Sequence, residues 1–175
     1  MKKVYIFFLA GLTLFGIAGF LTWSYLQVSE AKNQVQLAQV DLIAPIERQY
    51  HLLPSLLATA ENLQVRPELI KEVTECQDVF ENAAPKYSAS YWQASADLSK
   101  SLVSLAQAVD QEAATVMEVK AMELADDITE SATSLEAAAR SYNQSLQAFQ
   151  VFKSQFPTNL LTPLSSMEEE AYYPQ

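Results

Sequence analysis

The residues of this sequence with the most evident chemical potential are few and widely spaced. His51 is the only histidine and Cys76 the only cysteine. Glu47 precedes His51 by four positions, which would place both side chains on one face of a helix. There they could act as a catalytic Glu–His pair or as half of a metal site. One histidine and one cysteine cannot build a Cys/His zinc site or a di-iron centre with two Glu-x-x-His motifs. The simpler interpretation is a solvated histidine beside a helical neighbour.

Other catalytic and cofactor-binding patterns are also missing from the sequence. All the glycines, Gly11, Gly16 and Gly19, lie in one apolar stretch near the N-terminus. Phosphate-binding loops and nucleophile elbows need glycine for close backbone approach or a sharp turn, so these activities are not expected. The acidic runs Asp126–Asp127 and Glu168–Glu170 have no glycine-turned loop of the kind that binds calcium. We therefore expect no enzyme activity, no metal and no cofactor.

A denser group of residues, ARSYNQSLQAFQVFKSQFP, lies at 139–157 but suggests no chemistry. Tyr142, Leu146 and Phe149 follow one another at steps of four and three, which is the spacing of a helical core stripe. Tyr142 is therefore expected in a core, with its hydroxyl hydrogen-bonded to a neighbour. Asn143 flanks the stripe, and we expect it to fix the register between helices.

Apolar residues recur at steps of three and four along almost the whole chain, which predicts helices. The predicted helices are about Ser24–Asn62, Pro67–Phe80, Ser90–Val109 and Thr115–Phe156. The first is expected to bend at Pro45 and Pro54. Ser90 and Thr115 each begin a capping-box pattern, and the turn between the last two helices is placed at 110–115. The fourth helix stops before Pro157.

Helix lengths then determine the predicted architecture. The outer helices would reach about 60 Å and the middle two about 30 Å, and short connections favour antiparallel neighbours. The fold class is all-α: an N-terminal membrane helix, then an up-down-up-down four-helix bundle. In this arrangement Arg140 would lie near Asp41, which predicts an interhelical ion pair. Near the membrane only two helices pack together, so several apolar residues need a further partner: Val28, Val35, Leu146, Phe149, Phe152 and Phe156.

A membrane helix is predicted from the apolar stretch Val4–Thr22, which contains no charged residue. It would span about 28 Å, close to the hydrocarbon thickness of a bilayer. Trp23 and Tyr25 follow where interfacial aromatic residues gather. A cleaved signal peptide is the alternative, with a small-residue site at 16–18. The apolar run is longer than a signal core and continues into the next helix, so we favour an uncleaved anchor.

Charge indicates orientation and partners. Lys2 and Lys3 precede the apolar stretch, whereas Lys32 is the only basic residue soon after it. The positive-inside rule places the N-terminus in the cytoplasm and the bundle outside. The net charge of −10 argues against binding to nucleic acid or to anionic headgroups.

Three short motifs make the chain resemble the LemA family. The first is RQYHLLPSLL, in which Arg48, Leu53 and Pro54 fit the family pattern. The second is ARSYN, which fits an Arg-x-x-Tyr-Asn run, and the third is the Phe-Pro ending at Phe156 and Pro157. The likeness covers nearly the whole chain, but these motifs are structural in kind.

Several positions depart from the family pattern. His51 replaces the usual Asp, Ser55 replaces Asn, and Phe149–Gln150 stand where a second Tyr-Asn is common. The resemblance implies a divergent, membrane-anchored helical protein of the kind found with membrane or envelope proteins.

These inferences combine into one expected organisation: anchor 1–23, bundle 24–157 and flexible tail 158–175. The tail ends in EEEAYYPQ, which could dock on a partner, although disorder is the simpler interpretation.

We expect a single-pass protein of the bacterial inner membrane that acts as a scaffold or partner-binding module, through self-association or another envelope protein, with no small-molecule substrate. A ligand-sensing ectodomain of a signalling system is the alternative. Candidate contact residues are Arg48, Pro54, Arg140, Tyr142, Asn143, Phe149 and Phe156.

Overall fold

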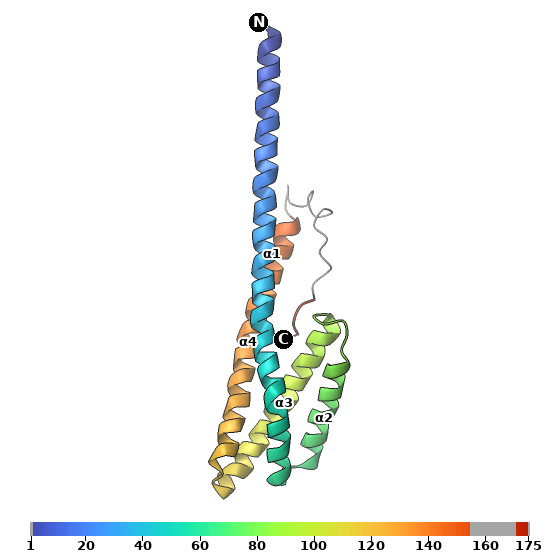
Figure 1. Cartoon of the computed structure of the whole chain (residues 1–175), viewed down its shortest axis with the longest axis vertical. Coiled ribbons are helices and arrows are strands. Elements are labelled where there is room, and N and C mark those ends of the chain that lie inside the picture. Colours follow the sequence, from blue (N-terminus) through green and yellow to red (C-terminus); the bar gives the residue numbers. More distant parts are fainter. Residues whose placement is uncertain (1, 155–170, 175) are drawn as a thin grey trace. The chain divides into compact units, whose positions relative to one another are not determined.

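The structure is a computed structural model that describes residues 2–154 and 171–174, with side chains for 11–154 and 171–174. In these ranges the chain forms helices joined by short turns (Figure 1). Their bounds are α1 Lys2–Asn62, α2 Pro67–Asn82, α3 Ala89–Val116 and α4 Val119–Ser154. The predicted all-α fold with long first and fourth helices is confirmed.

The chain divides into two compact units. The first comprises Met1–Leu37 with Ser145–Glu168, and the second comprises Ala38–Gln144 with Glu169–Gln175. These limits differ from the predicted domains, because α1 and α4 each contribute to both units. The last residues of the chain group with the second unit and not with a separate tail.

The second unit has an apolar core centred on α3. Buried side chains occur on most sides of this helix, whereas Val73 is the one buried residue of α2. The predicted α3 stripe of Leu98, Leu102, Leu105 and Val109 is buried. Facing it are Leu53 and Leu56 of α1 and Ile128 of α4. Each fully buried side chain of this size contributes about 1.5–3 kcal/mol to folding.

The start of α2 follows the sequence closely. Pro67 is the first helical residue, as predicted, and its fixed φ suits that position. Gln64 has a φ of 55°, which reverses the chain after α1, and the amide of Val65 donates to the carbonyl of Ala60. Val65 is buried in the core, so the turn itself is packed.

The N-cap of α3 lies two residues before the predicted Ser90 cap. Ser88 is the N-cap, and its Oγ accepts a hydrogen bond from the Tyr91 amide at 3.3 Å. The Ser90 hydroxyl lies 2.8 Å from that of Ser88. Tyr87 has a φ of 69° and turns the chain into the helix at this earlier point. Two serines two positions apart are alike in sequence, and the preceding turn selects between them.

The turn between α3 and α4 was predicted at 110–115, and this prediction is wrong. α3 continues to Val116, and Met117 then adopts a left-handed conformation with φ 56°. The amides of Met117 and Glu118 both donate to the carbonyl of Ala113, which closes the helix end. Ala113 is itself buried, so extending α3 adds to the core. At 28 residues α3 is about 42 Å long, and the expectation of two equally short middle helices fails.

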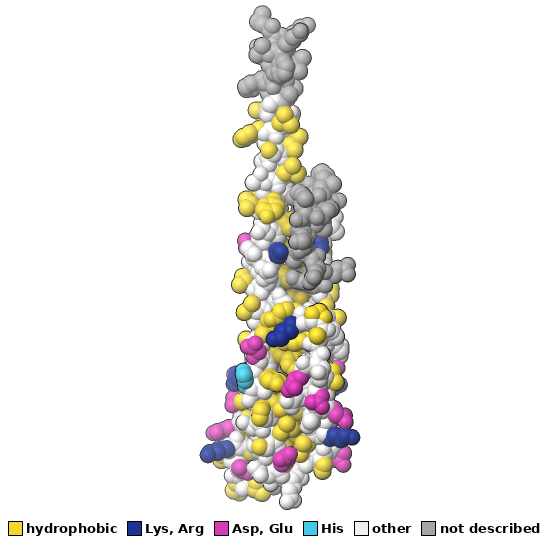
Figure 2. All heavy atoms as spheres, turned by 45° about the vertical axis from the view of Figure 1, so that its right-hand side comes forward, with side chains coloured by type: hydrophobic (Ala, Val, Ile, Leu, Met, Phe, Trp, Pro, Cys, Tyr) yellow, Lys and Arg dark blue, Asp and Glu magenta, His cyan; other side chains and the backbone are white. Residues whose placement is uncertain are grey.

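The first unit contains the N-terminal part of α1 and the end of α4. Its α1 side chains from residue 11 to 23 are largely apolar and exposed, with Phe15 at 82% exposure. Figure 2 shows hydrophobic side chains and no charged ones around this part of the helix, whereas charged side chains are frequent on the bundle. By length and composition, α1 could cross a membrane.

Farther along the first unit, several apolar side chains are already covered. Val28, Val35, Leu146 and Phe149 are buried, and the Lys153 ammonium lies 5.5 Å from the centre of the Phe149 ring. These four residues were expected to need a packing partner. Within a single chain these four side chains are therefore buried without a second copy, and self-association at this level stays a prediction.

Candidate binding site for the C-terminal tail

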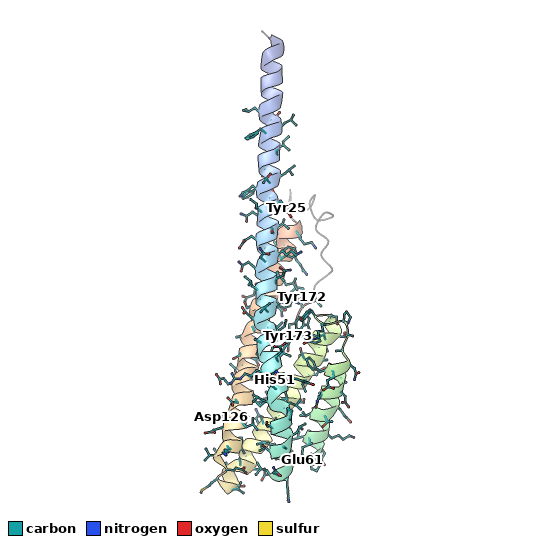
Figure 3. The ribbon with its side chains drawn as sticks, in the orientation of Figure 1. Tyr25, His51, Glu61, Asp126, Tyr172 and Tyr173 are labelled. Atoms are coloured by element: carbon teal, nitrogen blue, oxygen red, sulfur yellow. The ribbon has the colours of Figure 1, made fainter. Side chains whose placement is uncertain are left out.

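The end of the chain lies against α3 and α4 of the second unit, where Figure 3 labels Tyr172 and Tyr173. The side chain of Tyr173 is only 6% exposed. Flexibility was predicted for the whole of 158–175, and this is wrong for residues 171–174. Residues 158–170 lie outside the described residues. The hydrogen bonds below give the physical reason for the difference.

Asn143 of α4 pairs with the backbone of Tyr173 through two hydrogen bonds. Its Nδ2 donates to the Tyr173 carbonyl at 2.8 Å, and the Tyr173 amide donates to its Oδ1 at 2.9 Å. A side-chain amide thereby satisfies both backbone groups of one extended residue, as a neighbouring β-strand would. Asn143 is buried, so these bonds form away from water. Asn143 was expected to fix the register between helices, but its amide holds the tail.

Tyr142 adds a third hydrogen bond to the tail backbone. Its ring is buried at 1% exposure, which agrees with the predicted core position. Its hydroxyl donates to the carbonyl of Ala171 at 3.0 Å. Adjacent residues of one helix turn therefore hold alternate residues of an extended segment. The hydrogen bonds from Tyr142 and Asn143 therefore reach the backbone of the tail segment.

The side chain of Tyr173 enters an aromatic cluster on α3. Its ring centre lies 5.8 Å from that of Trp92, and Trp92 lies 5.7 Å from Tyr142. Ser95 Oγ lies 3.5 Å from the Tyr173 hydroxyl, but it also donates to the Trp92 carbonyl at 2.9 Å, which is the stronger bond. Burial raises the pKa of the Tyr173 phenol above its ordinary value, with Asp97 and Tyr91 adding to the increase.

Trp92 is the centre of this cluster. It is fully buried, and it also contacts Tyr87 and Tyr91 with ring centres 5.8 and 5.2 Å away. Its Nε1 is buried with no hydrogen-bond partner among the described residues. An unsatisfied indole N–H costs stability, so Trp92 is retained here for packing rather than for hydrogen bonding.

A groove of about 690 Å³ continues from the tail along α3 and α4. Tyr173 and Pro174 form part of its wall, together with Lys100 of α3 and Arg140 of α4. Apolar and polar side chains alternate along it, including Val103, Leu135 and Asp97. The size and mixed lining of the groove suit a peptide segment better than a compact apolar ligand.

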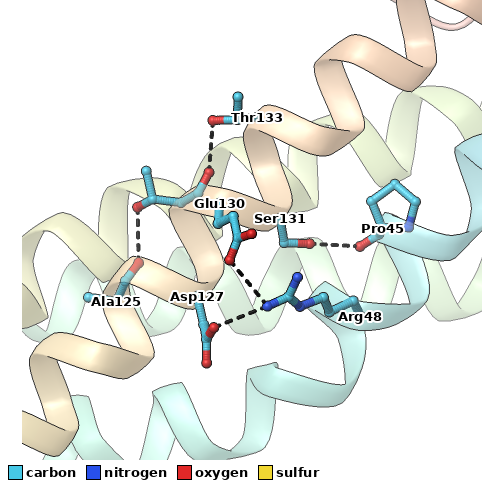
Figure 4. A network of polar contacts seen from close by, with 8 residues as sticks. Pro45, Arg48, Ala125, Asp127, Glu130, Ser131 and Thr133 are labelled. Carbon is cyan, nitrogen blue, oxygen red and sulfur yellow. Dashed lines mark hydrogen bonds and ion pairs between the residues drawn. The ribbon is translucent and has the colours of Figure 1, made fainter.

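Polar contacts elsewhere hold α1 against α4 and α3. Arg48 lies 3.1 Å from Asp127 and 3.5 Å from Glu130 (Figure 4), with 46% of the Arg48 side chain exposed. Exposed pairs of this kind contribute little. Two buried bonds matter more: Ser131 donates to the Pro45 carbonyl at 3.1 Å, and Gln49 donates to Ser99 at 3.0 Å.

The remaining predicted contact residues are dispersed. Pro54 is exposed on α1, and Phe149 belongs to the first unit. Arg140 pairs with Glu136 at 3.4 Å, one turn away on α4, and the expected pair with Asp41 is not among the ion pairs of the described residues. The α1–α4 ion pairs use Arg48 instead. Phe156 lies outside the described residues.

Sequence reasoning missed the receiving side of the tail site. No sequence motif singles out Trp92 or Ser95, and Tyr173 falls in the tail that is expected to be flexible. A usable signal was the aromatic run at 87–92, because two tyrosines and a tryptophan this close to one helix start need more packing surface than one core stripe offers. His51, the candidate base, is exposed next to the Tyr50 ring. Among the described residues, no three His, Cys, Asp or Glu side chains gather as metal ligands would.

Comparison with known protein families identifies the LemA family. The profile of the LemA family matches residues 36–175, which include the entire second unit. No curated protein matches the sequence. The matched region contains Asn143, Tyr142 and Trp92 and also the tail that they contact.

Proposed function

Because the chain belongs to the LemA family, we propose that it is a membrane-anchored protein of the bacterial cell envelope whose helical bundle binds other proteins and catalyses no reaction. The anchor is the N-terminal part of α1, and the binding module is the second unit. The membrane in question is the cytoplasmic membrane, with the bundle on its outer side.

The observation that carries this proposal is the exposure of apolar side chains on α1. Leu12, Leu14 and Phe15 are 63%, 68% and 82% exposed, and the run from 4 to 22 contains no charge. Exposing each of these side chains to water costs about 1.5–3 kcal/mol of free energy relative to an apolar environment. A lipid bilayer supplies that environment, and a helix of this length satisfies its own backbone hydrogen bonds there.

The orientation rests on the flanking lysines. Lys2 and Lys3 precede the apolar run, and the sequence that follows is acidic overall. Basic residues are retained on the cytoplasmic side of a span, whereas acidic domains are translocated without this penalty. The bundle then faces the periplasm, where its negative charge favours basic partner surfaces.

A binding role is supported by the groove along α3 and α4. It is open to a peptide-sized ligand and contains both signs of charge, through Lys100, Arg140, Asp97 and Glu136. In-membrane photo-crosslinking from Gln107, which lines the groove and is exposed, should capture a protein. Glu112 is an exposed control on the same helix outside the groove. Equal capture from both positions would count against the groove as the binding surface.

Cysteine labelling tests the anchor and its orientation. In a Cys76→Ser background, Val79→Cys places a thiol at an exposed site of α2, and Lys3→Cys places one before the span. A membrane-impermeant maleimide should label the Val79 site in intact spheroplasts and the Lys3 site only after lysis. The reverse labelling pattern would overturn the orientation. Release of the protein into the soluble fraction by an alkaline wash would overturn the anchor.

A further inference from the structure

The contacts that hold the C-terminal tail are those of a peptide bound to a receptor. They include three hydrogen bonds to the backbone of Ala171 and Tyr173, from side chains of Tyr142 and Asn143, and one buried aromatic side chain. Every one of them is noncovalent and lies within three consecutive residues. None depends on the covalent connection through 155–170, so a tail supplied by another molecule can form the same contacts.

We propose that this site binds the C-terminal segment of a second copy of the chain, so that two copies are joined by exchanging their tails. The ligand is an extended Ala-Tyr-Tyr-Pro segment, of which Tyr173 is the anchoring side chain. Tyr142, Asn143 and the Trp92 ring form the receiving site. The proposal does not depend on the membrane orientation or on any other partner.

Three observations favour a second copy as the occupant. Each copy carries the site and the one sequence known to fit it, so exchange in both directions closes a two-fold dimer without leaving an empty site. The intervening 16 residues, 155 to 170, reach at most about 55 Å when extended, which is long enough to cross to a neighbour. Exchange in both directions also preserves every tail contact. A tail bound within its own copy and a tail bound to the second copy therefore differ mainly in the entropy cost of bringing tail and site together.

The length of the connection also explains why one copy can bind its own tail. A connection of 16 residues gives an effective concentration on the order of millimolar, so the intramolecular arrangement dominates in dilute solution. Exchange becomes favourable when copies are crowded together. An experiment must therefore block the intramolecular arrangement before it measures the intermolecular one.

Two complementary variants do this. Asn143→Ala removes the receiving amide but keeps the tail, and a chain ending at Glu170 keeps the site but lacks the tail. Alone, the truncated chain has no tail to exchange, and the Asn143→Ala site binds any tail at least about 30-fold more weakly. Mixed in detergent, they should form a one-to-one complex in sedimentation experiments, because the tail of the first fills the empty site of the second. The matched control is the first variant carrying the same truncation, which should not associate with the second.

A peptide provides an independent measurement. In a Trp23→Phe background, Trp92 is the only tryptophan, and its ring lies 5.8 Å from that of Tyr173. The free peptide EEEAYYPQ should change Trp92 fluorescence saturably in the truncated chain, and at least tenfold more weakly in the intact chain, whose own tail competes. If Asn143→Ala fails to fold, as judged by helical circular dichroism, Tyr142→Phe replaces it, since this change removes only the hydroxyl bonded to Ala171.

The outcomes separate cleanly. A complex that forms from the complementary pair and is lost in the truncated control supports tail exchange. Folded variants that stay monomeric when mixed overturn it, even if the free peptide binds. Association that persists after the tail has been removed from both partners shows that another surface joins them, and it also overturns the proposal.

Discussion

The two hydrogen bonds between Asn143 and Tyr173 lead to a quantitative prediction about tail docking. Asn143→Ala removes both the donor to the Tyr173 carbonyl and the acceptor for the Tyr173 amide. When the tail lifts away, these backbone groups regain water, whereas in the docked variant they stay buried without a partner, so the loss is at least that of two ordinary hydrogen bonds. At about 1 kcal/mol each, docking weakens by at least about 2 kcal/mol, which corresponds to about 30-fold.

Hydrogen exchange at the Tyr173 amide measures this equilibrium directly, because the amide is protected only while it is bonded to Asn143. We expect its exchange to accelerate at least about 30-fold in Asn143→Ala, while amides in the middle of α3 stay unchanged. Gln144→Ala is the matched control: it is adjacent on the same helix and exposed, and it should leave the exchange rate as in the parent.

A second substitution at the same position tests the direction of the hydrogen bonds. In Asn143→Asp, an ionised carboxylate still accepts from the Tyr173 amide but faces the Tyr173 carbonyl without a proton to donate. Docking should therefore weaken at neutral pH and partly recover when the new carboxyl is protonated. Unchanged exchange at Tyr173 in Asn143→Ala would refute the reasoning, since it would mean that the pairing contributes nothing to holding the tail.

Three further predictions concern the bundle and the phenol of Tyr173. Leu105→Ala, in the centre of the core, should lower the free energy of unfolding by about 2–5 kcal/mol, whereas Leu37→Ala, at an exposed position, should change it by less than about 0.5 kcal/mol in denaturant titrations. Arg48→Ala should cost about 0.5 kcal/mol, and an effect above about 1.5 kcal/mol would contradict the exposed character of its ion pairs. Because burial raises the pKa of Tyr173, the docked tail keeps its proton to higher pH than the free tail; docking is therefore at full strength below pH 10.0 and weakens as pH rises through the elevated pKa. Trp92 fluorescence in the Trp23→Phe background should follow this loss, and Tyr173→Phe should remove its pH dependence.

Much of the fold could be predicted because its signals are local. The stripe through Leu98, Leu102 and Leu105 repeats at helical spacing, and each of these residues is buried in α3. Pro67 begins α2 because its ring fixes a helical φ, a property that belongs to the residue alone. The core position of Tyr142 followed from the same periodicity.

The helix ends were less predictable, because several residues could serve as caps. Ser88 and Ser90 are equivalent in type, and the left-handed turn at Tyr87 decides between them. Thr115 begins a capping pattern in sequence, yet its hydroxyl bonds to the Glu112 carbonyl inside α3. Continuing the helix buries Ala113, and the stabilisation from this burial outweighs the local capping signal.

The candidate site shows the limit of reasoning from sequence most clearly. The sequence by itself determined the helices, the apolar N-terminal stretch and the helical face on which Tyr142 lies, because each depends on residues a few positions apart. Only the tertiary structure decided what Tyr142 and Asn143 bind. Their partner lies about thirty residues away, beyond the end of α4, and the match between one side-chain amide and one extended backbone residue leaves no periodic trace in the sequence. Hydrogen bonds between distant segments depend on where the packed helices place them, and that placement belongs to the folded chain.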